Sequence, residues 1–154
     1  MAKKYFYRVF YRSATTIITS ATKGGSYPDY TISGWTPIPG LAAEVAKMSP
    51  DIDGEEPLGD GTQLATGEKI PLEVKIVGFT SANYATIRGA FVNTKVDLLL
   101  MDPDQFGTSY AAFGVRLFPK LTVEGGAEPA IVLAGERKYG AGVSTLPFQM
   151  VTVS

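Results

Sequence analysis

The sequence predicts a mainly β protein, an antiparallel β-sandwich or barrel that carries one short central helix. Three observations support this fold class. Short segments rich in β-branched and aromatic residues recur along the chain, and turns containing many of its 17 glycines and 10 prolines separate them. Helical spacing is clear in one central segment only. The length of 154 residues fits a single domain, residues 1–154, with a core large enough to need no disulfide.

The first predicted strand lies in the stretch KKYFYRVFYRS, residues 3–13, where cations and aromatic rings alternate without an acid. Successive side chains of a strand point to opposite faces. This places Lys4, Phe6, Arg8, Phe10 and Arg12 on one face, and Tyr5, Tyr7, Val9 and Tyr11 on the other. Neither face is wholly polar, so we expect both to be covered, one of them from outside the subunit.

Residues 20–40 are predicted to be mostly loop, because glycine, proline and serine are frequent there. The β-branched segment TTIIT, residues 15–19, could continue the first strand or pair with it, and one short strand is expected at residues 30–33. Residues 41–48, LAAEVAKM, fit a helical turn or a strand. The nearby Pro50 and the surrounding β segments favour a strand.

A long acidic loop is expected at about residues 49–69. This segment contains four glycines, two prolines and an excess of acids. Loops of this length are uncommon inside a compact domain and are usually functional or mobile. We therefore expect this loop to become ordered against a neighbouring molecule.

The central block gives the clearest prediction, a strand at residues 70–79, a helix at about 81–92 and a strand at 95–101. Alternating apolar and charged residues indicate the first strand. Ser81 can cap the helix and Asn93 suits its end. Its apolar side chains recur at spacings of three and four, at Tyr84, Ile87 and Phe91.

After a turn at residues 102–107, the rest of the chain is predicted to be β. The expected strands are residues 110–118, 120–125, 130–135 and 146–153, with Gly-rich turns between them.

The chain has no cysteine and no histidine, which excludes Ser-His and Cys-His nucleophile pairs and the usual zinc sites. The acidic cluster Asp51, Asp53, Glu55, Glu56 and Asp60 does not fit an EF-hand, because Gly54 falls at the fourth position of the loop instead of the sixth. We therefore predict that the protein is not an enzyme and has no cofactor and no metal site.

Membrane association is not expected. No apolar run approaches the length of a membrane span, and Arg8 and Arg12 interrupt any signal-peptide core. The protein is therefore expected to stay in the compartment where it is made.

Aromatic rings with interleaved cations also hold single-stranded nucleic acids, and a lone tryptophan can stack on a sugar or a base. One interpretation is therefore a small β-sandwich binding module for nucleic acid or glycan. Its ligand-contacting residues would be Tyr5, Tyr7, Tyr11 or Trp35. Against this, a lone Trp beside two prolines more often fills the edge of a core.

Charge is distributed unevenly along the chain. Residues 1–23 carry five basic residues and no acid, whereas residues 24–69 carry eight acids and two bases. Opposite charges on two segments of one subunit allow successive subunits to attract each other.

The middle of the chain reads IPGLAAEVAKMSPDIDGEEPLGDGT, followed by EKIPLEVKIVGFTSANYATIRGAFVNTKVDLLLMD. This order of strand, acidic Gly-rich loop, strand, short helix and strand resembles the tail tube proteins of long-tailed bacteriophages. Their fold is shared with the tube protein of bacterial type VI secretion. The resemblance implies a structural virion protein, assembled in the host cytoplasm, whose hexameric rings stack into a tail tube. Such a tube surrounds the tape-measure protein and later conducts DNA without binding it specifically.

This resemblance, together with the uneven charge, gives candidate inter-subunit contacts. In the basic strand they are Lys4, Tyr5, Phe6, Arg8, Phe10 and Arg12, and in the acidic loop they are Asp51, Asp53, Glu55, Glu56 and Asp60. The basic strand of one ring would meet the acidic loop of the next. A tail terminator, a head-to-tail connector or a capsid decoration protein would fit the same composition.

Overall fold

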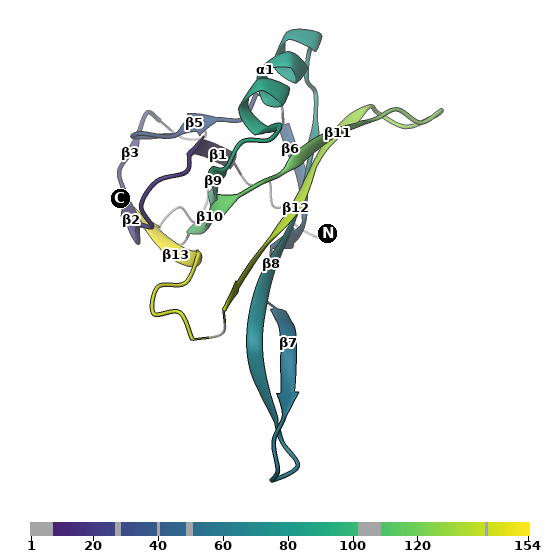
Figure 1. The fold of residues 1–154 in the computed structure, drawn as a ribbon. Coiled ribbons are helices and arrows are strands. Elements are labelled where there is room, and N and C mark those ends of the chain that lie inside the picture. Colours follow the sequence, from purple (N-terminus) through teal and green to yellow (C-terminus); the bar gives the residue numbers. More distant parts are fainter. Residues whose placement is uncertain (1–7, 27–28, 40, 49–50, 102–108, 141) are drawn as a thin grey trace, which may run out of the picture.

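A computed structural model describes residues 8–26, 29–39, 41–48, 51–101, 109–140 and 142–154. In these residues the protein is mainly β, with two larger curled sheets that pack face to face and one helix at one end (Figure 1). The predicted fold class, a β-sandwich or barrel with one short helix, is confirmed.

The first sheet has six strands in the order β2-β13-β10-β9-β1-β5. They are β1 (Arg8–Ser13), β2 (Ser20–Ala21), β5 (Thr36–Pro37), β9 (Val96–Met101), β10 (Ser109–Val115) and β13 (Phe148–Val153). All neighbours are antiparallel except β13 and β2. The two edge strands have only two residues each, which limits how far another chain could pair with them.

The second sheet has the order β11-β12-β8-β6, and β7 pairs with β8 beyond the end of β6. Its strands are β6 (Leu41–Met48), β7 (Asp51–Pro57), β8 (Gln63–Val77), β11 (Phe118–Thr122) and β12 (Ala130–Gly140). All its pairs are antiparallel. A separate two-stranded sheet joins β3 (Lys23–Gly24) to β4 (Thr31–Ile32).

A first hydrophobic core fills the space between the two large sheets. Along β8 the apolar side chains alternate with exposed charges, as predicted for a half-buried strand. The buried members on β8 are Ile70, Leu72, Val74 and Ile76. Strand β9 contributes Leu98 and Leu100, and the helix closes one end of this core with Ile87 and Phe91.

A second core covers the other face of the six-stranded sheet. The described parts of segment 14–39 lie over this face and bury Ile32 and Trp35 against Phe10 and Phe113. All six residues of β9 are buried, because both of its faces are covered by protein. The expectation that one face of the first strand is covered from outside the subunit is therefore wrong for residues 8–13, since the covering segment belongs to the same chain.

The acidic loop expected at residues 49–69 is instead a β-hairpin, formed by β7 and the first part of β8. Glycines and charged residues are tolerated in these strands because the hairpin extends away from the cores. Segment 15–19 does not continue β1, and Ile17 and Ile18 pack against the second core. The described part of residues 20–39 contains four two-residue strands. Strand β4 is the short strand predicted at residues 30–33, and the other three were not predicted.

The single helix of the described residues, α1 (Ser81–Phe91), agrees closely with the prediction of 81–92. Its N-cap is Thr80 and not Ser81. The Thr80 side chain accepts a hydrogen bond from the Asn83 N–H, and the Asn83 side chain accepts one from the Thr80 N–H. Asn93, just after the helix, has a positive φ of 55° and ends it as expected.

The predicted strand at residues 110–118 corresponds to β10, which ends at Val115, whereas its last residue, Phe118, begins β11 in the other large sheet. The expected turn at residues 102–107 lies outside the described residues.

Candidate functional site

The most distinctive feature of the fold is a hairpin that projects from the body of the molecule (Figure 1). Strand β8 pairs with β12 only as far as the pair Gly67–Gly140. Beyond that point β7 and β8 pair only with each other in the described residues, and we call residues 55–66 the arm. A two-stranded hairpin without a third strand is only marginally stable in water. The arm is therefore the part of the described fold that would gain most from a partner.

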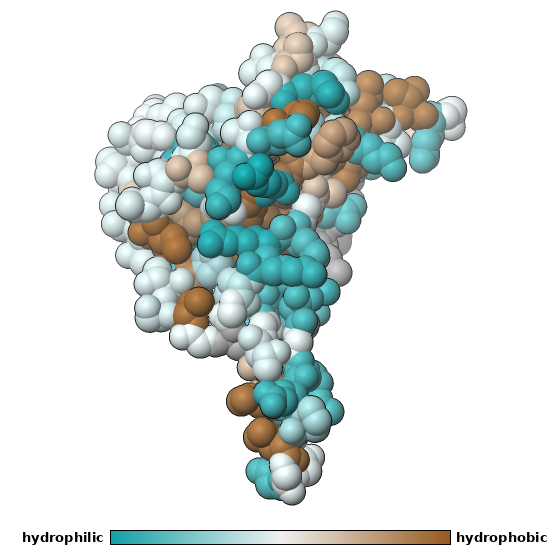
Figure 2. Space-filling model, viewed as in Figure 1, coloured by the Kyte–Doolittle hydropathy of each residue, from teal (hydrophilic) through white to brown (hydrophobic). Residues whose placement is uncertain are grey.

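The surface of the arm is both acidic and apolar. Leu58 and Leu64 are 42% and 51% exposed, and apolar atoms are visible on the arm in Figure 2. Glu55 and Glu56 are exposed on β7. Exposed leucines on a thin projection cannot reach the body's cores, so they are available to another molecule.

The turn at the tip of the arm is held by Asp60. The hydroxyl and the N–H of Thr62 both donate to Asp60 Oδ1, at 2.5 and 2.9 Å. The Thr62 hydroxyl bond, followed by the backbone bond, lowers the pKa of Asp60 below its usual value. The tip therefore presents an ionised carboxylate at neutral pH.

The root of the arm is tied to the body by ion pairs. Asp53 lies 3.8 Å from Lys69 Nζ and 3.6 Å from Lys138 Nζ. Asp53 therefore already has cationic partners in its own chain, whereas the sequence suggested that it contacts another subunit. In the same region, burial and then the neighbouring Glu68 carboxylate raise the pKa of Tyr139 to about 12. Asp51, at the start of β7, lies opposite Lys69 in the register.

The basic N-terminal strand is used differently from the prediction. The Arg12 guanidinium donates from Nε to Asp97 Oδ2 at 2.9 Å and from Nη2 to the Thr16 carbonyl at 2.7 Å. It also lies 4.4 Å from the centre of the Trp35 ring. Asp97 is completely buried and accepts two further bonds, from the N–H groups of Thr15 and Gly114. Arg12 therefore fastens segment 14–39 to the six-stranded sheet.

Other residues of this strand were also predicted to contact a neighbouring subunit, and the structure describes two of them, Phe10 and Arg8. Phe10 has no exposed surface, so it is a core residue and not a contact between subunits. Arg8 retains 31% side-chain exposure and lies 3.7 Å from Asp29. The predicted contacts Lys4, Tyr5 and Phe6 lie outside the described residues, and so does Tyr7, which was predicted to bind a ligand in the alternative interpretation.

Two aromatic residues of the proposed ligand-binding set face the cores. Trp35 is 7% exposed and meets Phe113 edge to face. The Tyr11 ring lies 5.1 Å from that of Phe91, next to the first core. Trp35 is buried and Tyr11 is half-buried against Phe91, so these two residues do not support a nucleic-acid or glycan site.

The sequence reasoning missed a second exposed surface, at the end of the molecule that carries α1. We call it the β11 face, and it consists of Arg88, Arg116, Phe118 and Lys120. Phe118 is 56% exposed, and the three cations are exposed as well. The Arg88 guanidinium lies 5.9 Å from the Phe118 ring centre. The available signal was an aromatic residue, Phe118, two positions before a basic one, Lys120, but the sequence predicts that they belong to two separate strands, residues 110–118 and 120–125.

Gly135 of β12 allows the chain to pass close to β12 at residue 116, just before β11. A Cβ at this position would collide with the Arg116 carbonyl oxygen, so the close approach of β12 to residue 116 requires glycine. The chain can therefore cross from β10 to β11 tightly against β12, which leaves the Arg116 side chain at the surface. There Arg116 Nη1 donates to the Asn93 carbonyl at 3.4 Å.

Comparisons with family models, curated proteins and solved structures found no match for this chain. In the described part of the chain no group of acidic residues could hold a metal ion, and its helix is too short to span a membrane. Function is therefore inferred from the chain's own surfaces.

Proposed function

We propose that this chain is a structural subunit that assembles with copies of itself, and that the assembly is a phage tail tube made of stacked rings. The arm carries the proposal. It is a two-stranded projection with exposed leucines and acids, and nothing in the described residues of the same chain covers it. A contact with another subunit would remove the leucines from water and support the hairpin.

The open edges of the five-stranded sheet support assembly into rings. Strand β11 forms one edge, and β6 and β7 form the opposite edge, with no further partner strand in the described residues. These edges are longer than the two-residue edges of the other sheet. Pairing opposite edges of successive subunits would close a ring and leave no edge of this sheet open.

In this proposal the protein belongs to the tail of a virion and is assembled in the host cytoplasm. Its partners are its own copies and other tail proteins, such as the tape measure. DNA passes through the tube without specific binding, and the chain has no catalytic role.

The experiment that tests the proposal removes the arm. Residues 55–66 are replaced by an Asn-Gly turn, which suits a two-residue hairpin connection. Light scattering and negative-stain images then compare the variant with the full chain. We expect the full chain to form rings or tubes with an open centre, and the variant to keep its circular dichroism spectrum but lose the stacked tubes.

Two outcomes would contradict the proposal. If the variant without the arm still forms full-length tubes, the arm is not needed for assembly. If the full chain stays monomeric at every concentration, it does not assemble with copies of itself. Single rings that never stack would instead favour a terminator, connector or decoration protein over a tube.

A further inference from the structure

We infer that the arm of one copy docks on the β11 face of a second copy. This inference rests on the proposed function, because it names the two surfaces that meet when subunits assemble. It replaces the contact suggested by the sequence, in which the basic N-terminal strand receives the acidic segment. Arg12 of that strand is already paired with Asp97 inside its own subunit.

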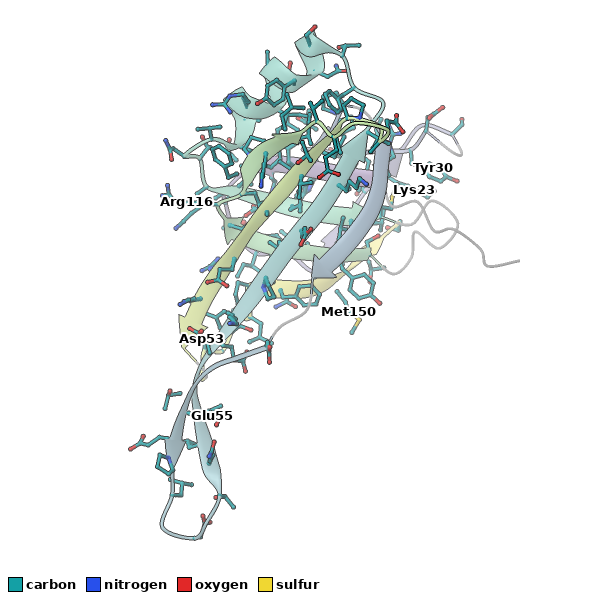
Figure 3. All side chains as sticks on the ribbon, turned by 90° about the vertical axis from the view of Figure 1, so that its right-hand side faces the viewer. Lys23, Tyr30, Asp53, Glu55, Arg116 and Met150 are labelled. Carbon is teal, nitrogen blue, oxygen red and sulfur yellow. The ribbon has the colours of Figure 1, made fainter. Side chains whose placement is uncertain are left out.

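The two surfaces lie at opposite ends of the molecule. Figure 3 shows Glu55 on the projecting arm and Arg116 near α1, with the five-stranded sheet extending between them. The arm therefore cannot bend back onto the β11 face of its own chain without breaking the sheet. The contact must join different copies, and because the two surfaces differ, it repeats head to tail. Such a heterologous contact generates a stack or a ring and not a closed pair.

The two surfaces have complementary chemistry. The arm presents Glu55, Glu56 and Asp60 beside Leu58 and Leu64, and the β11 face presents Arg88, Arg116 and Lys120 beside Phe118. Opposite charges would orient the approach, while burial of the leucines against the Phe118 ring would supply affinity. Two arms would repel each other because both are acidic, and two β11 faces would repel each other because both are basic.

The elements that form the β11 face, namely α1, the β10–β11 crossing and β11, contribute cations and no acids to it. Helix α1 contains no acid. In the sheet, Phe118 lies opposite Ala134, which in turn lies opposite the exposed Glu73 of β8. In the next row across the sheet, Lys120 lies opposite Val132, which in turn lies opposite the exposed Lys75 of β8. The acid and the base of β8 offset each other. Two other exposed acids nearby are Glu124, in the turn after β11, and Glu136 of β12, and the three cations Arg88, Arg116 and Lys120 outnumber them.

The cations of the β11 face are also partly ordered before any partner binds. Arg88 lies 5.9 Å from the ring centres of both Tyr84 and Phe118, and Arg116 donates to the Asn93 carbonyl. Side chains that already occupy a limited set of positions lose less entropy on binding. Two arginines are suited to this role because a guanidinium can pair with a carboxylate through two parallel hydrogen bonds.

A charge swap tests the inference on the full chain. One variant carries Glu55→Lys and Glu56→Lys, a second carries Arg116→Glu and Lys120→Glu, and a third combines all four substitutions. Light scattering measures the protein concentration at which assemblies form, at low and at high salt. Each two-residue variant should raise this concentration about tenfold or more, and the combined variant should restore it to within about threefold of the original. Salt should raise the concentration for the unchanged chain, because it screens the attraction.

A matched control is Met150→Ser, which alters an exposed apolar residue of the six-stranded sheet and should leave assembly unchanged. Circular dichroism and urea unfolding establish that every variant keeps its fold. If the variant at Arg116 and Lys120 assembles like the unchanged chain while removal of the arm abolishes assembly, the inference fails and the proposed function stands. A combined variant no better than the two separate ones would also overturn the inference. If removal of the arm has no effect, both fail.

Discussion

The body and the arm share one strand, β8, but the two halves of this strand are stabilised in different ways. Its second half lies between β12 and β6, and it buries Ile70, Leu72, Val74 and Ile76 in the first core. Its first half, in the arm, pairs with β7 alone and exposes Leu64. The body is thus stabilised by contacts inside the chain, whereas the arm has the composition of a surface that is completed by another molecule.

The largest effect expected in the body follows from removing the Phe10 ring. Phe10 is fully buried in the second core, so Phe10→Ala should lower the free energy of unfolding by about 4 kcal/mol, measured by urea denaturation. Phe118→Ala is the matched control, because this ring is 56% exposed. Similar losses for the two variants would contradict the assignment of Phe10 to the core.

The next effect concerns the buried ion pair of the body. Asp97→Ala leaves Arg12 without its carboxylate and two N–H groups without their acceptor, which should cost about 3 kcal/mol in urea denaturation. Asp60→Ala, in the exposed turn of the arm, should change the stability of the body little. An Asp97→Ala variant as stable as the unchanged chain would exclude Arg12 as the fastening between segment 14–39 and the sheet.

The third prediction concerns the root, where the two regions meet. The pKa of Tyr139 is raised from 10.0 to about 12, so the folded state holds a proton that the unfolded state releases first. Stability should therefore be unaffected by this group below pH 10 and should fall as the pH rises from 10 to about 12. Urea denaturation across this range, compared with Tyr139→Phe, measures the effect. An equally steep fall in the Phe variant would assign the pH dependence to other groups.

The smallest effect on stability, combined with a clear effect on assembly, is expected in the arm. Leu58→Ser and Leu64→Ser should each change the free energy of unfolding by less than about 0.5 kcal/mol, because both side chains are already exposed. Together they should weaken assembly measured by light scattering. If they destabilise the monomer as strongly as a core substitution, the distinction between body and arm is lost.

The body was predictable because its pattern has a clear period. Apolar residues alternate in β8 from Ile70 onward and recur at helical spacing in α1, since each of these elements has one buried face. The arm lacks this signal because water reaches both of its faces, and its glycines and acids resemble those of a loop. Its acids were recognised as contact candidates, but its strands were not.

The role of β1 could not be predicted from its own pattern. The alternation of rings and cations correctly indicated that both faces are covered. It could not show that segment 14–39 covers one face, because that segment contains only two-residue strands and gives no periodic signal. The β11 face was missed because its cations come from α1, the β10–β11 crossing and β11, which only the fold brings together.

The continuity of β8 has a mechanical consequence. This strand runs without a break for 15 residues, from the arm into the part of the second sheet that packs on the first core. A pull on the arm along the strand would load the hydrogen bonds to β12 and β6 at the same time, so that they would have to shear together and could not open one by one. We expect force spectroscopy on the arm to show a single high-force rupture, whereas gradual peeling would contradict this. Tension applied through one subunit's arm would then be carried directly into the best-packed part of that subunit.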